Sequence, residues 1–248
     1  MRIIWDNEID KYTPTFNSEN PSHLVENIQD YQLTKTYRST GDVDEWIKID
    51  AGVGLTITAS CAAILGHNLT SGSVCKIQAH ADDTHWGDPD LNETFVYDAD
   101  VMTEYFTEDS FRFWRFHFAD AANPDTYIEI GRLTLGTFLQ IDIHGREISI
   151  IYEDTSRVDE SPSGQSFGDP GIIRRIYYFT FPYWNNTKRK EVVAMVMVIK
   201  KVKPVVLVPD ENNTDKMDIV YCKLNDNMSI NHIVDFSWNG ILAFKETF

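Results

Sequence analysis

The chain has 248 residues, a length that suits one large domain or two small ones. Hydrophobic residues make up 42% of it and charged residues 24%, which is ordinary globular usage and excludes a disordered chain. The 22 basic and 38 acidic residues leave a formal net charge of −16, so we expect no broad basic surface and no nucleic-acid partner.

The first residues turn acidic after four positions and lack the apolar core of a secretory signal. No run approaches the roughly 18 apolar residues that span a bilayer, so we expect no membrane insertion. The three cysteines, Cys61, Cys75 and Cys222, include no C-x-x-C pair and are odd in number. Reduced thiols are the simplest interpretation, and a Cys61–Cys75 bridge is the alternative.

The beginning of the chain is predicted to be an extended arm over residues 1–19, with a short strand near residues 3–5. The spacing of Leu24, Val25 and Ile28 then fits one helical turn, although a short strand is also open.

Strict alternation follows at residues 46–50. It places Trp46 and Lys48 on one face of a strand and Ile47 and Ile49 on the other. The apolar pair is the one expected to face a core.

The strongest strand pattern of the chain is F-R-F-W-R-F-H-F. Here Trp114, Phe116 and Phe118 share one face, whereas Arg115 and His117 share the opposite one.

The second half of the chain also consists of short strand patterns separated by turns. Strands are predicted at residues 139–143, 148–152, 172–181, 192–199, 204–208, 217–224 and 241–244, with turn-forming clusters between them. Residues 191–199 could instead be helical, because Val, Ala and Met recur there without alternation. Many short strands separated by turns predict a β-sandwich or jelly roll.

Several motifs occur in a recognisable order. The run W-I-K-I-D-A-G at residues 46–52 resembles the W-x-x-ϕ-D-ϕ-G strand of discoidin-like, galactose-binding-like jelly rolls, and F-R-F-W-R-F resembles their paired-arginine strand. The run I-G-R-L-T-L-G, ending at Gly136, resembles their closing strand, with Arg132 where many members carry Glu. The resemblance implies an all-β fold: a discoidin-like jelly-roll β-sandwich at residues 20–136, with an additional β-rich extension at 137–248 that packs back on it.

The combination resembles more narrowly a group of bacteriophage virion proteins. It implies a structural component of a phage tail or tail tip, such as a minor tail protein, located in the virion after synthesis in the host bacterial cytoplasm. Its expected partners are further copies of itself, as a homo-oligomer and possibly a ring, and other phage tail proteins. On this reading the chain is not an enzyme and has no cofactor.

Two other functions stay open. A carbohydrate-binding module that recognises a host surface glycan would suit the jelly-roll resemblance and the aromatic residues Trp86 and Tyr37 on expected loops. A polysaccharide-degrading enzyme is motivated only by the abundance of carboxylates and aromatic residues, and no catalytic constellation is evident.

Residues 82–109 hold ten acidic residues and no Lys or Arg. Of these, Asp82, Asp83, Asp88 and Asp90 are candidate ligands for Ca²⁺, which prefers carboxylate oxygens. The spacing lacks the EF-hand register, and a solvated acidic loop is the alternative.

The candidate ligand-binding residues are Tyr37, Arg38, His85 and Trp86, because the resemblance implies that ligand loops gather at one end of the barrel. Trp86 is predicted either to stack on a sugar or a neighbouring subunit, or to pack over its own jelly roll. Arg115, like Arg112, is expected to be structural, pairing with an acid such as Asp50 or stacking on a ring, although a carboxylate ligand is the alternative.

Overall fold

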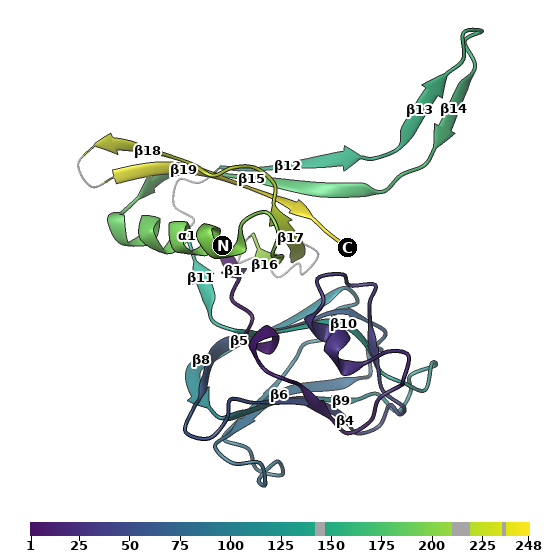
Figure 1. The fold of residues 1–248 in the computed structure, drawn as a ribbon, viewed down its shortest axis with the longest axis vertical. Coiled ribbons are helices and arrows are strands. Elements are labelled where there is room, and N and C mark those ends of the chain that lie inside the picture. Colours follow the sequence, from purple (N-terminus) through teal and green to yellow (C-terminus); the bar gives the residue numbers. More distant parts are fainter. Residues whose placement is uncertain (142–146, 210–218, 235–236) are drawn as a thin grey trace. The chain divides into compact units, whose positions relative to one another are not determined.

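The computed structural model describes residues 1–141, 147–209, 219–234 and 237–248 (Figure 1). Their contacts divide them into two compact units, one made mainly of Arg2–Phe138 and the other mainly of Leu139–Val208 with Val220–Thr247. The predicted fold class is confirmed, because antiparallel strands dominate both units and the first unit is a jelly-roll β-sandwich.

The first unit consists of two facing sheets. One has five strands in the order β2-β4-β9-β6-β7, and the other has four in the order β3-β10-β5-β8. The elements of this segment are β1 (Arg2–Ile4), η1 (Glu8–Lys11), β2 (Thr15–Phe16), η2 (Val25–Gln29), β3 (Tyr37–Arg38), β4 (Glu45–Asp50), β5 (Ile57–His67), β6 (Val74–His80), β7 (Leu91–Thr94), β8 (Val101–Phe111), β9 (Phe113–Ala119), β10 (Glu129–Gly136) and β11 (Phe138–Gln140).

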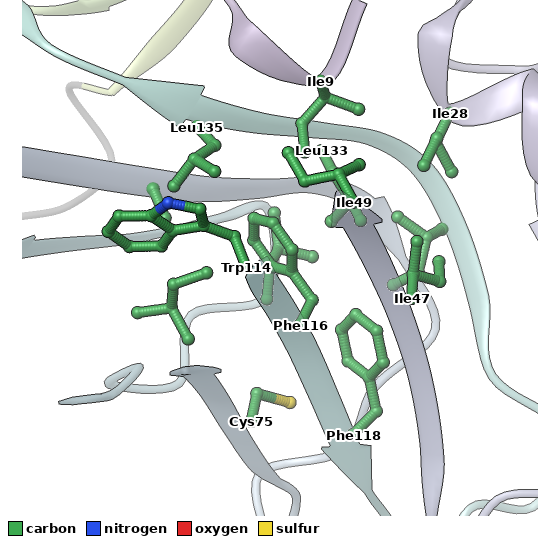
Figure 2. Close-up of a cluster of buried hydrophobic side chains, with 14 of the residues drawn as sticks. Ile9, Ile28, Ile47, Ile49, Cys75, Trp114, Phe116, Phe118, Leu133 and Leu135 are labelled. Carbon is green, nitrogen blue, oxygen red and sulfur yellow. The ribbon is translucent and has the colours of Figure 1, made fainter. Parts of the chain in front are cut away.

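The core between these sheets follows from the alternation of the strands. On β4 the side chains of Ile47 and Ile49 are each 1% exposed, and on β9 Trp114, Phe116 and Phe118 are buried beside them (Figure 2). The predicted inward faces of both strands are therefore confirmed. Burying each of these side chains stabilises the folded state by about 1.5–3 kcal/mol. The alternation of apolar and polar residues therefore determines which face of each strand points toward the core.

The two short 3₁₀ helices close the core on the side of β10. Ile9 of η1 and Ile28 of η2 are buried in the same cluster as Leu133 of β10 (Figure 2). The helical turn predicted from Leu24 and its neighbours is confirmed as η2.

The second unit is built on a strongly antiparallel sheet in which β12, β15, β19, β17 and β16 are neighbours in that order. Strand β18 pairs with the first half of β19, whereas β17 pairs with its last residues. The hairpin β13–β14 is paired separately, and both of its strands are exposed. The elements are β12 (Glu147–Asp154), β13 (Arg157–Glu160), β14 (Ser166–Asp169), β15 (Ile173–Trp184), α1 (Asn186–Ile199), β16 (Val205–Val208), β17 (Val220–Leu224), β18 (Ser229–Val234) and β19 (Ser237–Glu246).

The strand predicted at residues 192–199 is wrong, since this segment is the second half of helix α1. Its buried residues, Val192, Met195 and Ile199, recur every three to four positions, which is the helical period rather than the strand period. The helix contacts β15 and β19 of its own unit. The alternative prediction, a helix at residues 191–199 based on the absence of strand-like alternation, is confirmed.

Asn185 starts this helix, because its side-chain oxygen accepts a hydrogen bond from the Lys188 amide at 2.8 Å. Replacing Asn185 with alanine is expected to lower the free energy of unfolding by about 1 kcal/mol. Asn185→Asp keeps a capping oxygen and should lose much less. Urea denaturation followed by circular dichroism compares the two, and equal losses would contradict the capping role.

The structure also bears on the predicted state of the cysteines and on membrane-spanning helices. The Cys61–Cys75 bridge is wrong, because all three cysteines are free and buried. Within the described part of the chain, no helix has both the length and the apolar character needed to cross a membrane. Of the predicted strands, residues 142–143 and 217–218 lie outside the described residues.

Candidate functional site

The outer face of the five-stranded sheet carries large polar and aromatic side chains. It consists of the residues that alternate with the buried ones, so Trp46 and Lys48 of β4 lie outward, as does Arg115 of β9. The strand register places Lys48 directly opposite Arg115, and Arg115 directly opposite Gln78 of β6. Three neighbouring strands therefore present one polar row across the sheet.

A pocket of about 190 Å³ lies on this face. Its lining consists of Trp46, Lys48, Asp83, Trp86 and Arg115. The strands supply three of these residues, and the loop between β6 and β7 supplies Asp83 and Trp86. We call it the sheet-face pocket.

Hydrogen bonds tie the loop to the strand. Lys48 Nζ lies 2.6 Å and 2.5 Å from the two carboxylate oxygens of Asp83, and Trp86 Nε1 donates to Asp83 Oδ1 at 3.0 Å. Asp83 thereby fixes the position of Trp86. On the neighbouring strands, Arg115 Nε and Nη2 donate to Gln78 Oε1 at 2.9 Å and 2.5 Å.

Both cations of the pocket also lie against aromatic rings. The Cζ atom of Arg115 is 4.4 Å from the centroid of the Trp86 ring, and Lys48 Nζ is 5.2 Å from that of Trp46. Burial lowers the pKa of Arg115, but a guanidinium stays charged at neutral pH. The pocket thus combines two indole rings with two fixed positive charges and one carboxylate.

The same loop holds a second group of polar residues beside the pocket. His85 Nδ1 lies 2.9 Å from Asp82 Oδ1, and Thr84 donates to that oxygen from its amide at 2.9 Å. The hydrogen bond with His85 is the main cause that holds the pKa of Asp82 well below its usual range, and the same bond raises the pKa of His85. His80, at the end of β6, stacks on His85 with ring centroids 5.2 Å apart.

The four calcium candidates do not share one site in the described structure. Asp83 is paired with the pocket lysine, and Asp90 Oδ2 lies 3.5 Å from His80 Nε2. The Asp88 amide donates to a loop carbonyl. Only Asp82 belongs to a cluster of potential metal ligands among the described residues, and its neighbours there are histidines.

Tyr37 and Arg38 lie on β3 of the other sheet. Tyr37 is completely buried, its hydroxyl donates to Ser18 O at 2.7 Å, and burial raises its pKa. Arg38 Nε lies 2.9 Å from Glu129 Oε2. The structure therefore brings Trp86 and His85 together but does not bring them to Tyr37 and Arg38, contrary to the single group of loops implied by the resemblance.

The two arginines of the F-R-F-W-R run have structural partners, as expected. Arg112 forms a two-point salt bridge with Asp50, at 2.7 Å and 2.8 Å, and lowers the pKa of that carboxyl. Arg115 stacks on Trp86 but also lines the pocket. Trp46 and Lys48 were not among the predicted site residues, although their outward position next to buried residues was a usable signal, and ligand binding by Arg115 was only the alternative to a structural role.

No protein-family model and no curated protein matches the sequence. Among solved structures, the chain is similar to chitosan-binding module 1 of a chitosanase/glucanase from Paenibacillus sp. IK-5, with 18% identity, a TM-score of 0.41, and coverage of 52% of this chain and 98% of that one.

Two other similar structures come from Streptococcus pneumoniae and Clostridium perfringens. A fucose-binding module of Streptococcus pneumoniae has 8% identity, a TM-score of 0.42, and coverage of 54% of this chain and 99% of its own. A Clostridium perfringens module in complex with GalNAc-β-1,3-galactose has 11% identity, a TM-score of 0.41, and coverage of 53% and 99%. The likeness is one of β-sandwich architecture.

Proposed function

We propose that the chain binds a carbohydrate in the sheet-face pocket. The observation that carries this proposal is the lining itself, in which Trp46 and Trp86 share one pocket with Lys48, Asp83 and Arg115. Such a combination of aromatic surface with a few placed polar groups is typical of small-molecule sites.

A sugar ring offers an apolar C–H face and an edge of hydroxyl groups, and the pocket offers a partner for each. Indole rings supply apolar area for the ring face. The cationic groups of Lys48 and Arg115 donate hydrogen bonds to hydroxyl oxygens, and Asp83 accepts hydrogen bonds from hydroxyl groups. Hydrogen bonds with one charged partner are the stronger kind, which favours specific recognition.

The size of the pocket indicates how much of a glycan it holds. Its volume of about 190 Å³ is below the roughly 300 Å³ at which pockets for drug-sized ligands begin. We therefore expect it to take one sugar unit, such as the end of a chain, while the rest of the glycan extends over the exposed sheet.

The test is a glycan array with the full chain, followed by calorimetric titration of the best ligand. Trp86→Ala is expected to weaken binding at least tenfold, because it removes a ring that lines the pocket and covers Arg115. Trp86 lies in a surface loop, so the variant should keep its circular dichroism spectrum and thermal midpoint.

Trp238→Ala is the matched control. Trp238 is on β19 of the other unit and is partly exposed, and its Nε1 donates to Asn186 at 2.8 Å. It should leave glycan affinity unchanged. Absence of any glycan ligand, or equal affinity of the Trp86 variant and the wild type, would refute the proposal.

A further inference from the structure

Two histidines and an aspartate lie together beside the sheet-face pocket but outside its lining. His80 is the last residue of β6, and Asp82 and His85 follow in the loop. Their potential ligand atoms all lie within 4.8 Å of one another. We propose that His80, Asp82 and His85 bind a divalent transition-metal ion, with zinc as the reference case.

The separations between these atoms suit a shared ion. Asp82 Oδ1 lies 2.9 Å from His85 Nδ1 and 3.5 Å from His80 Nδ1. Zinc holds nitrogen and oxygen ligands at about 2.0–2.2 Å, so adjacent corners of a tetrahedron around it are about 3.3 Å apart. The two distances from Asp82 lie close to this value, on either side of it, and the two histidines, whose ligand atoms lie within 4.8 Å of each other, move closer together around the ion.

The main-chain contacts of His80 are compatible with metal binding. His80 Nδ1 lies 2.9 Å from the Asp82 amide and 3.1 Å from the Asp82 carbonyl oxygen, and in the tautomer with an unprotonated Nδ1 its lone pair accepts the hydrogen bond of that amide. A metal ion would take over that lone pair. The released amide lies in an exposed turn, where water replaces its partner.

The ligand types select the class of metal. Two imidazole nitrogens and one carboxylate suit zinc, nickel or copper, whereas calcium and magnesium prefer oxygen ligands alone. The side chains of Asp82 and His85 are 53% and 64% exposed, so the ion has an entry path and its remaining positions are open to water. The sequence-based expectation of calcium in this loop is thus replaced by a different metal class.

The site would link a strand to the loop of the pocket. His80 is mostly buried at the end of β6, with a side chain 14% exposed, and is paired with Phe113 in the sheet. Asp82 and His85 flank Asp83 and precede Trp86. A bound ion therefore fixes the loop that carries Asp83 and Trp86 to the end of strand β6.

The experiment is calorimetric titration of chelator-stripped full-length protein with zinc chloride, and separately with calcium chloride. One zinc ion per chain and no calcium heat are expected. His85→Ala and Asp82→Asn should each weaken zinc binding at least tenfold. Both residues are exposed, and circular dichroism confirms that the variants are folded.

His117→Ala is the matched control, because His117 of the same sheet has its Nε2 2.7 Å from Asp44 Oδ1 but belongs to no group of three potential metal ligands among the described residues. Its zinc affinity should equal that of the wild type. Calcium binding in place of zinc, unchanged zinc binding in His85→Ala, or an equal loss in His117→Ala would overturn the proposal. No sugar is present in this experiment, so its result is independent of the glycan-binding proposal.

Discussion

Replacing Trp114 with alanine is expected to lower the free energy of unfolding of the jelly-roll unit by about 3–5 kcal/mol. The side chain is 0% exposed, and its Nε1 donates to the buried carbonyl of Ile57 at 3.1 Å. Its ring also contacts those of Phe106 and Phe111, with centroids 5.7 Å and 5.8 Å away. The variant leaves a large cavity and an unpaired carbonyl in the core.

Urea denaturation followed by circular dichroism measures this loss. Trp114→Phe keeps an aromatic ring in the core and should lose clearly less than the alanine variant. A loss below about 1 kcal/mol for Trp114→Ala would contradict the described core, since truncating a fully buried tryptophan lowers the free energy of unfolding by about 3–5 kcal/mol.

The same variant also affects the candidate site. Trp114 is the inward neighbour of Arg115 on β9, so its burial holds the strand with Arg115 on the outer face. A loss of core packing at Trp114 is therefore expected to weaken glycan binding without any contact to the ligand.

Replacing Arg132 with leucine is expected to lower the free energy of unfolding by about 3 kcal/mol. Its side chain is 3% exposed and lies 2.6 Å from Asp10. It also donates to the carbonyl oxygens of Ile28 and Asp30, at 3.3 Å and 3.1 Å. Leucine leaves these carbonyls without that donor, which is costly for the buried carbonyl of Ile28, whereas the Asp10 side chain is 28% exposed and still accepts a hydrogen bond from Asn7.

Arg112→Leu is the matched comparison. The salt bridge of Arg112 to Asp50 has equally short distances, but its two side chains are 30% and 40% exposed, so water screens the pair and replaces it when it is removed. We expect the stability loss to be far smaller than for Arg132. Equal losses for the two leucine variants in the same urea titration would show that burial does not set the contribution of these arginines.

Arg132 also connects elements that are distant in the sequence. It links β10 to η1 and η2 by binding Asp10 and two main-chain carbonyls. An acidic residue could not donate to those carbonyls. Its partner Asp10 lies 122 positions away in the sequence.

The role of the chain in a phage particle stays a prediction, as do its assembly with copies of itself and its location. They rest on ordered motifs, whereas the structure describes a single chain. Electron microscopy of purified phage particles labelled with an antibody to this chain tests the structural role. Light scattering of the purified chain tests whether it forms a homo-oligomer.

Local periodicity was sufficient for much of the fold. The alternation at Trp46–Asp50 and Phe113–Phe118 predicted which side chains are buried, because neighbours on a strand must point to opposite faces. The strand predicted at residues 192–199 was wrong, whereas its helical alternative was right, since Val, Ala and Met are compatible with either element and Asn185 caps a helix here.

By itself, the sequence determined the all-β class and the inward faces of the central strands, and it predicted candidate ligand-binding residues, His85 and Trp86, in one loop. Only the tertiary structure decided that Lys48 lies opposite Arg115 and that Asp83 and Trp86 close over them. The physical reason is that burial is encoded by each strand's own period, whereas pairing register depends on strands that are distant in the chain. The pocket exists only once β4, β9 and β6 lie side by side, whereas the cluster of His80, Asp82 and His85 is local to the end of β6 and its loop.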